Sequence, residues 1–439
     1  MPGVVILGAG PAAVVCALGV QRLGYNVTVV SEARRFSAVE GVSQRVLESL
    51  QHAGLRNVLD TVEQACVRSV LWNGEYNEQN HEYLLDRPRF DQALRQQLKD
   101  AGVPLLTQRV LRVHSTQRGH QIQLGSGQVL TADFLIEARG RQAPGSGKKM
   151  RGPETLSLLN RWQGPPQSVK TALHSHPDGW SWMAQLADGR CYWQLTLDVA
   201  SAQLPSKERL LKYCQQRRQA STFAQDFFQQ HEAQNIDLHA RSSSSTLCNE
   251  SCGSNWLRIG DAAMAVDPLS GNGVFQALSS ALQAPAVLYT LLEKPQDAAL
   301  AKEFHQQRIE HLFLRFARLG RDFYKMEQQW PDKPFWQARQ QWPDQQPMHH
   351  EPDFTQLKLE HRPVIENGQI VSREVVISPD QPLGMWHHSG ITLAPMLRQL
   401  REQGLSVLLE QYSTIEQGYI KSWLSSQGYF ANNSIASFG

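Results

Sequence analysis

The start of the chain arranges its apolar residues in the order strand, helix, strand. Four consecutive apolar residues, Val4–Leu7, predict a buried strand, and an apolar helical pattern then continues to Leu23. Gly24 is suited to the end of that helix, and the apolar run Val27–Val30 predicts the next strand. Strands that alternate with helices in this way are typical of an α/β fold with a Rossmann-like sheet.

The middle of the chain has shorter apolar runs that predict antiparallel strands. They occupy Val169–Leu173, Trp180–Leu186 and Cys191–Leu197. Helical patterns follow at 206–232 and 301–330. A group of strands inserted within the α/β pattern indicates a second domain built on an antiparallel sheet.

A Pro-rich segment at 340–352 separates the last part of the chain from the rest. Beyond it, Asn367-Gly368 predicts a hairpin turn, and helical patterns follow at 394–402, 405–412 and 414–427. We therefore divide the chain into three domains. A split α/β domain covers 1–154 and 246–340, an inserted antiparallel-sheet domain that would hold the substrate covers 155–245, and a small α+β, winged-helix-like domain covers 353–439.

The turn after the first strand has the spacing of a dinucleotide-binding loop. Gly8 allows a tight turn, Gly10 lets a diphosphate approach the backbone, and Ala13 lets helix and strand pack closely. The helix that begins here offers free N–H groups to the phosphates. The candidate residues of this loop are therefore Gly8, Gly10, Pro11, Ala12 and Ala13.

Later segments supply the other side of the candidate dinucleotide site. Glu32 ends the second strand, where its carboxylate can accept hydrogen bonds from ribose hydroxyls. Arg45 is predicted in the first turn of a helix capped near Ser43, where it can face phosphate or ribose. At the end of a later strand, Gly260-Asp261 leads into a Pro/Gly-rich loop and a second helix N-terminus. The remaining candidates are Arg89, Gly140, Gly271, Asn272, Gly273 and Val274.

Length, composition and charge allow several domains and exclude several classes of protein. The 439 residues carry a net charge of +2, which is too small to indicate nucleic acid or an anionic membrane as a partner. No apolar run reaches the roughly 20 residues that span a bilayer. The N-terminus enters the first strand directly, so we expect a cytoplasmic protein. The six cysteines form neither a disulfide framework nor a zinc motif, and we expect no metal site.

The paired elements at 8–13 and 260–274 resemble those of group A flavoprotein monooxygenases and of the related flavin-dependent halogenases. This resemblance implies FAD as the cofactor, with Glu32 on the adenosine ribose, Arg45 near the diphosphate and Asp261 on the ribityl chain. It also implies that the loop from Pro268 to Gly273 meets the isoalloxazine ring. Those hydroxylases usually carry Asp-Gly where this chain has Arg139-Gly140, which argues against handling of NADPH in their manner.

Trp180 and Trp182 are two residues apart and therefore share one face of a predicted strand. Flavin halogenases carry a Trp-x-Trp pair near the active site, although the residues that follow it here do not continue their motif, and two core aromatic residues remain the other interpretation. Halogenases also need a lysine on the side of the flavin domain, and residues 1–98 contain none. The pattern favours oxygenation over halogenation, with Asp267 and Pro268 as further catalytic candidates.

In finer detail, the chain resembles the flavoproteins that mature tryptophan-derived quinone cofactors. Segments 40–47, 138–144 and 330–336 and the Trp pair carry this resemblance. It implies an FAD-dependent monooxygenase that hydroxylates a tryptophan of a partner polypeptide during biogenesis of cysteine tryptophylquinone. The partner would be the precursor of a quinone-cofactor oxidase or amine dehydrogenase subunit, with molecular oxygen and a reductant as co-substrates. Two alternatives stay open: a hydroxylase of small aromatic molecules, and a flavin-bearing maturation chaperone without turnover.

Overall fold

The core of the nucleotide-binding part is a five-stranded parallel sheet. The computed structural model describes residues 2–34, 36–144, 150–229 and 234–430. The strand order is β18 (Trp256–Arg258), β10 (Phe134–Glu137), β1 (Gly3–Leu7), β2 (Asn26–Val30) and β6 (Leu105–Leu106). The apolar runs that predicted the first two strands form β1 and β2, which pair in register from Gly3 with Asn26 to Leu7 with Val30. The predicted α/β fold is confirmed.

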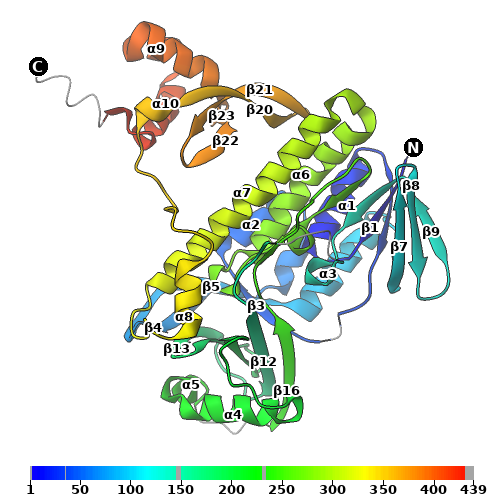
Figure 1. The fold of residues 1–439 in the computed structure, drawn as a ribbon, viewed down its shortest axis with the longest axis vertical. Helices are drawn as coiled ribbons and strands as arrows, with labels where there is room; N and C mark the ends of the chain where they lie inside the picture. Colours follow the sequence, from blue (N-terminus) through cyan, green and yellow to red (C-terminus); the bar gives the residue numbers. More distant parts are fainter. Residues whose placement is uncertain (1, 35, 145–149, 230–233, 431–439) are drawn as a thin grey trace, which may run out of the picture. The chain divides into compact units, whose positions relative to one another are not determined.

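Four helices belong to this part of the chain, and small residues let the first of them pack closely. They are α1 (Pro11–Arg22), α2 (Gln44–His52), α3 (Arg87–Asp100) and α6 (Gly273–Glu293). Nine of the twelve residues of α1 are buried, so that helix runs through the interior instead of along a surface. β7 (Val110–Thr116), β8 (Gly119–Leu124) and β9 (Val129–Ala132) form a three-stranded antiparallel sheet (Figure 1). This sheet contributes Ile122 and Leu124 to the apolar core around Leu7 and Val30.

The second large sheet has eight strands and extends beyond the inserted domain predicted from the sequence. Its strand β4 (Cys66–Trp72) pairs in parallel with β13 (Lys170–His176), so that strands within residues 39–86 join strands from 155–242. The predicted boundary at 155 therefore omits three strands of this sheet, because the pairing of distant strands has no local sequence signal. The order is β16 (Gln234–Ser242), β12 (Thr155–Gln163), β15 (Arg190–Asp198), β14 (Gly179–Gln185), β13 (Lys170–His176), β4 (Cys66–Trp72), β5 (Glu75–Asp86) and β3 (Val39–Val42).

The two faces of this sheet have different surroundings. One face carries Trp162, Met183 and Trp193, which pack with residues of α4 (Leu210–Ala220) and α5 (Thr222–Phe227). Because side chains alternate along a strand, Trp180 and Trp182 lie on the opposite face. This second face therefore holds the candidate catalytic tryptophans. The helical pattern predicted over 206–232 corresponds to α4 and α5, and its residues 230–232 lie outside the described residues.

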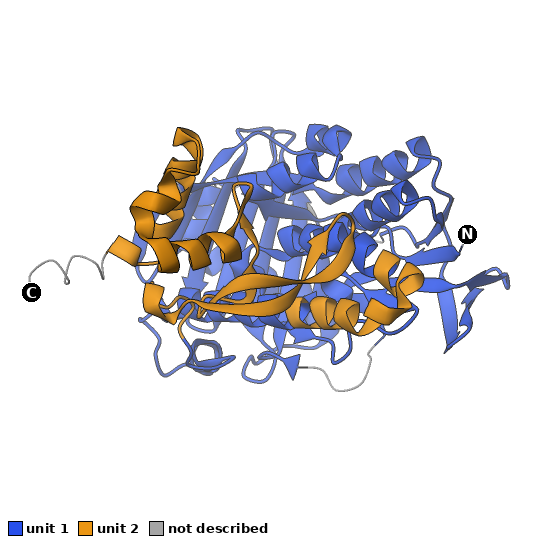
Figure 2. Cartoon of the chain, turned by 90° about the horizontal axis from the view of Figure 1, so that it is seen from above, with its two compact units in different colours: residues 1–288, 309–346 blue, residues 289–308, 347–439 orange. Residues whose placement is uncertain are grey.

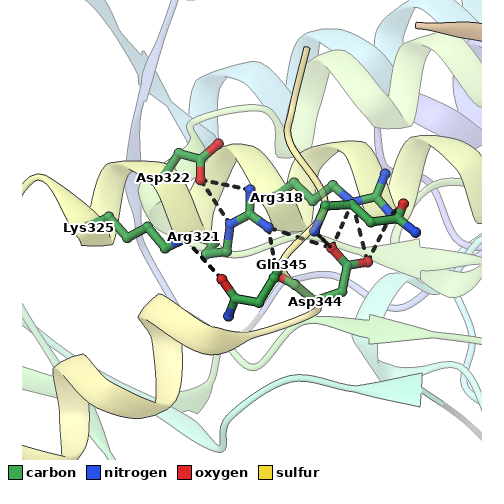
Figure 3. A network of polar contacts seen from close by, with 7 residues as sticks. Arg318, Arg321, Asp322, Lys325, Asp344 and Gln345 are labelled. Carbon is green, nitrogen blue, oxygen red and sulfur yellow. Dashed lines mark hydrogen bonds and ion pairs between the residues drawn. The ribbon is translucent and has the colours of Figure 1, made fainter. Parts of the chain in front are cut away.

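A network of charged side chains fastens the segment after α8 (Pro334–Gln341) to α7 (Ala298–Lys325). The Arg318 guanidinium lies 2.8 Å from Asp344 Oδ2, and Arg321 Nη1 donates to the Asp344 carbonyl oxygen at 2.6 Å (Figure 3). Lys325 Nζ donates to Gln345 Oε1 at 3.3 Å. These bonds fix the end of α7, where Tyr324 lies. Three short strands complete this part of the chain: β11 (Met150–Arg151), β17 (Thr246–Leu247) and β19 (Met264–Ala265).

The chain divides into two compact units (Figure 2). The first comprises 1–288 and 309–346, and the second comprises 289–308 and 347–439. The second unit includes residues 289–308, which form the end of α6 and the first part of α7 and lie outside the predicted domain at 353–439. Within this unit, Thr290 of α6 accepts a hydrogen bond from the backbone N–H of Ile370 at 2.8 Å. A cut near residue 350 would therefore separate segments that pack together.

The second unit is an antiparallel sheet followed by two helices. The sheet consists of β20 (Lys358–Glu366), β21 (Gln369–Ser378) and β22 (Gln381–Met385), and Asn367 and Gly368 form the predicted hairpin turn with φ angles of +50° and +76°. The remaining elements are β23 (His387–His388), β24 (Ile391–Thr392), α9 (Leu393–Leu409) and α10 (Thr414–Ser426). The winged-helix comparison stays a prediction. In the part of the chain that the structure describes, no helix has the length and apolar character needed to cross a membrane.

Candidate active site

The loop between β1 and α1 has the conformation that its glycines predicted. Gly8 has a φ of +111°, and a Cβ atom there would lie 2.4 Å from the carbonyl oxygen of Ala138. Gly10 precedes α1, and a Cβ atom there would meet nothing within 4 Å. Pro11 occupies the first turn, where its missing N–H is not needed. The N-terminus of α1 therefore faces open space with no side chain on its cap residue, as a bound diphosphate requires.

Small residues bring the two ends of the predicted site together. Gly260 has a φ of +57°, and a Cβ atom there would lie 3.0 Å from Cβ of Ala12 and 3.6 Å from Cβ of Ala277. The Gly260 N–H donates to Ser280 Oγ at 2.9 Å, which ties this turn to α6. The start of α1 and the first turns of α6 therefore meet at Gly260. The two helix N-termini therefore lie close to each other, and their shared role in binding a cofactor stays a prediction.

Asp261 lies beside the turn that follows β10. Its Oδ2 is 3.5 Å from Nε of Arg141, and a Cβ atom on Gly140 would be 3.9 Å from its Cβ. Burial raises the pKa of Asp261, and the positive charge of Arg141 opposes that rise. The side chain of Asp261 nevertheless stays 34% exposed, so it can meet a ligand. Arg141 is a neighbour of Asp261 that was not predicted from the sequence, where its only signal is its position one residue after Gly140.

The loop before α6 leaves its backbone open. Asp267 Oδ1 accepts the N–H of Leu269 at 2.9 Å, and Pro268 opens the short turn that follows. Gly271 has a φ of +63°, and added Cβ atoms on Gly271 or Gly273 would meet nothing within 4 Å. The Asn272 side chain donates to the Ser270 carbonyl at 2.5 Å and holds the turn, while Val274 is buried in α6. This open backbone at a helix N-terminus suits the polar edge of a flavin ring.

A hydrogen-bonded chain joins this loop to the sheet. Trp180 Nε1 donates to Tyr324 Oη at 3.2 Å, and Tyr324 Oη donates to Asp267 Oδ1 at 3.0 Å. Burial raises the pKa of Asp267, and burial together with the Asp267 carboxylate raises that of Tyr324 well above its usual value. Tyr324 therefore links two of the predicted catalytic residues, Trp180 and Asp267. Tyr324 was not predicted as a site residue, because the helical pattern around it marks it only as an apolar position.

An aromatic cluster surrounds this chain. Trp182 belongs to it and donates from Nε1 to Glu82 Oε1 at 3.4 Å. Glu82 is buried and lies against Gly41, where a Cβ atom would be 2.0 Å from Glu82 Oε2. The two predicted tryptophans thus donate to different partners. Trp180 donates to Tyr324, which in turn bonds Asp267, and Trp182 donates to Glu82. The cluster consists of Trp180, Tyr324, Phe335 and Trp336, with Trp72, Leu173, Trp182, Leu269 and Trp330 packed against it.

Three remaining candidates have different surroundings. Arg45 is exposed and its guanidinium lies 4.3 Å from the centre of the Phe275 ring, next to the loop before α6. Glu32 follows β2, and its backbone carbonyl accepts from Arg95 at 2.8 Å. Arg89 is 54% exposed, lies 3.7 Å from Glu63 and donates to the carbonyl oxygen of Asp60 at 3.2 Å, so these contacts lie outside the glycine loops. The structure therefore does not bring Arg89 to the other candidates, and its role stays a prediction.

The buried arginine of this region is Arg87, two residues earlier on α3. Its side chain is 7% exposed and pairs with Glu40 at 3.1 Å and Asp91 at 2.7 Å. These two charges hold the pKa of Arg87 above its usual value against the effect of burial, while Arg87 helps to lower the pKa of Glu40. Within the described residues, no group of three His, Cys, Asp or Glu side chains is placed to hold a metal ion.

Comparison with known proteins identifies the family. The family model described as tryptophan halogenase matches residues 43–367. The chain belongs to the tryptophan halogenase family. One solved structure, described as the peptidyl tryptophan dihydroxylase QhpG essential for tryptophylquinone cofactor biogenesis, is 53% identical, covers 97% of this chain and 99% of its own, and superposes with a TM-score of 0.88.

Two more distant proteins are also similar to this chain, one in structure and one in sequence. The flavin-dependent halogenase CmlS is 17% identical, covers 98% of this chain and 95% of its own, and has a TM-score of 0.76. LodB of Marinomonas mediterranea, assigned as an FAD-dependent oxidoreductase, is 21% identical over 75% of this chain and 95% of its own. The expectations of an FAD cofactor and of an oxidoreductase are confirmed by these relatives. The roles of individual residues stay predictions.

Proposed function

We propose that this protein is an FAD-dependent monooxygenase that hydroxylates a tryptophan side chain of a partner polypeptide during tryptophylquinone biogenesis. The observation that carries this proposal is the 53% identity to the peptidyl tryptophan dihydroxylase QhpG over nearly the whole of both chains. The match covers both compact units, so it includes whatever parts of the chain recognise the polypeptide. LodB, which is matched over 95% of its own length, supports the same class of flavoenzyme.

The residues of the site suit FAD and an aromatic substrate. Gly10 and the α1 N-terminus would hold the diphosphate, Asp261 the ribityl chain, and the open loop at Gly271 the flavin ring. Reduced flavin supplies an electrophilic oxygen from O₂, which reacts with electron-rich rings such as indole. The buried aromatic cluster around Trp180 keeps water away from the loop, and Asp267 provides a carboxylate beside it.

The hydroxylation reaction also determines which co-reactants the enzyme needs. Hydroxylation puts one atom of O₂ into the ring and releases the other as water, which consumes two electrons from a reductant. The partner would be the precursor of a quinone-cofactor oxidase or amine dehydrogenase subunit, with cysteine tryptophylquinone as the finer assignment. A cytoplasmic location, and the absence of nucleic acid and membrane partners, remain predictions from composition.

The direct test is co-expression with a candidate tryptophylquinone precursor, followed by mass spectrometry of its peptides. We expect the mass of one or two oxygen atoms to appear on a single tryptophan. A precursor with phenylalanine at that position is the matched control and should gain no oxygen. Binding of the precursor without added oxygen would support a maturation chaperone, and oxygen on free aromatic compounds alone would support a small-molecule hydroxylase.

Halide ions should not be incorporated during turnover. Halogenases need a lysine on the side of the flavin domain, and residues 1–98 of this chain contain none. We expect the precursor to gain oxygen and no bromine or chlorine when either halide is present in excess. Mass spectrometry distinguishes the products by their isotope patterns. A brominated or chlorinated tryptophan would overturn the assignment as a monooxygenase.

A further inference from the structure

Tyr324 connects elements that lie far apart in the sequence. It lies at the end of α7 and is 2% exposed. Its hydroxyl oxygen is 3.2 Å from Nε1 of Trp180 on β14 and 3.0 Å from Oδ1 of Asp267 in the loop before α6. The network around Arg321 and Lys325 fixes the same turn of α7 to the segment after α8 (Figure 3). The hydroxyl of Tyr324 is therefore held in place from both sides.

The direction of these hydrogen bonds follows from the chemistry of the groups. An indole N–H can only donate, so the Tyr324 oxygen accepts from Trp180 and its own proton points to Asp267. The N–H of Leu269 also points to Oδ1 of Asp267. Both donors use the same oxygen, and Oδ2 accepts no hydrogen bond from the described residues. Asp267 thus presents one bonded and one available carboxylate oxygen.

We propose that Tyr324 is a positioning residue that holds Asp267 as a carboxylate whose Oδ2 accepts the proton leaving the ring carbon of the substrate. This inference rests on the proposed function. When the C–O bond forms, the ring carbon loses its C–H proton to Asp267, and that proton later contributes to the water formed from the second oxygen atom. The two electrons come from the two-electron reductant of the flavin.

The charges around Asp267 predict what removal of the hydroxyl does. Arg339 from α8 and Arg141 from the turn after β10 both lower the pKa of Asp267, and Tyr324 from α7 lowers it through a hydrogen bond. Arg339 is already paired with Asp198, and Arg141 with Asp261. Tyr324 is the side chain that bonds Asp267 directly. Burial already raises the pKa of Asp267, and without the Tyr324 hydroxyl this pKa rises further, so the carboxylate persists only at higher pH.

The test is the pH profile of Tyr324→Phe in the full-length, FAD-loaded enzyme. We expect the acidic limb of the rate of precursor oxidation to move upward by about one pH unit, because a hydrogen bond to the charged form is lost. The rate should recover at high pH. Tyr192→Phe is the matched control, because Tyr192 is a buried tyrosine of β15 outside this hydrogen-bonded chain, and its profile should coincide with that of the wild type.

A second readout separates this inference from the proposed function. The absorption spectrum of bound FAD is titrated with pH without precursor, and its midpoint should move upward in Tyr324→Phe. If the wild type never oxidises the precursor while this midpoint moves, the proposed function and the proton transfer from the substrate fail, and only the effect of Tyr324 on the charge of Asp267 stands. Unshifted profiles, or a uniform loss of rate at every pH, would overturn the role of Tyr324. Trp180→Phe should shift the midpoint less in the same direction, and it replaces Tyr324→Phe if that variant does not fold.

Discussion

Gly8→Ala is expected to destabilise the protein by about 2–5 kcal/mol and to abolish FAD binding. The φ of +111° already disfavours any side chain, and the new methyl group would lie 2.4 Å from the carbonyl oxygen of Ala138. That carbonyl belongs to the backbone after β10, which cannot move without breaking the sheet that β10 forms with β1. Urea unfolding measures the loss of stability, and flavin absorbance after gel filtration measures the loss of FAD.

Gly10→Ala is the matched control on the same loop. Gly10 has a φ of −80°, and an added Cβ meets nothing within 4 Å, so the methyl group costs about 1 kcal/mol or less as a poorer helix cap. The methyl group instead enters the space where a diphosphate would lie. We expect a folded apoprotein with weakened FAD binding. Equal stability of both variants, or full FAD retention by Gly10→Ala, would contradict this account of the loop.

Arg339→Leu is expected to lower the free energy of unfolding by about 3–5 kcal/mol. The Arg339 side chain is 2% exposed and its Nη1 lies 3.2 Å from Oδ1 of Asp198, which is 7% exposed. Arg339 also donates to Thr155 Oγ1 at 2.7 Å and stacks 3.9 Å from the centre of the Phe335 ring. Leucine keeps much of the apolar contact but leaves the Asp198 carboxylate buried without its cation. Denaturant unfolding of the full chain is the measurement.

The control for this prediction is an ion pair of the same type on the same sheet. Arg161 and Asp237 lie 2.5 Å apart, with their side chains 35% and 67% exposed. Because water screens exposed charges, Arg161→Leu should change stability by at most about 1 kcal/mol. A loss at Arg339 no larger than the loss at Arg161 would show that burial of the Asp198 pair does not stabilise the fold.

Local sequence determined the elements that depend on short-range chemistry. The apolar runs of β1 and β2, the glycines that allow a positive φ at Gly8 and Gly260, and the turn at Asn367 are all properties of a few neighbouring residues. The small residues that let α1 and α6 meet were also visible, because a known loop spacing relates them to a dinucleotide. The local sequence therefore predicts where a candidate FAD site lies, and the structure confirms the backbone conformation at its glycines.

Arg87 and Arg89 have different surroundings that local sequence alone does not specify. Both belong to the first turn of α3, and the sequence favoured Arg89 as a cofactor ligand. In the structure Arg87 is buried between Glu40 and Asp91, whereas Arg89 points outward. Which side of a helix faces the interior depends on how that helix is rotated against its neighbours. That rotation is set by packing and cannot be read from two arginines in one turn.

The tertiary structure alone decided which distant residues meet. The parallel pairing of β4 with β13 added residues 39–86 to the sheet that holds the tryptophans, and Thr290 joined the second compact unit. The meeting of Trp180, Tyr324 and Asp267 has the same origin, since β14, α7 and the loop before α6 are joined only by the folded chain. Backbone preferences and short motifs act over a few residues. These contacts between distant residues form instead because folding buries whole apolar faces of helices and sheets.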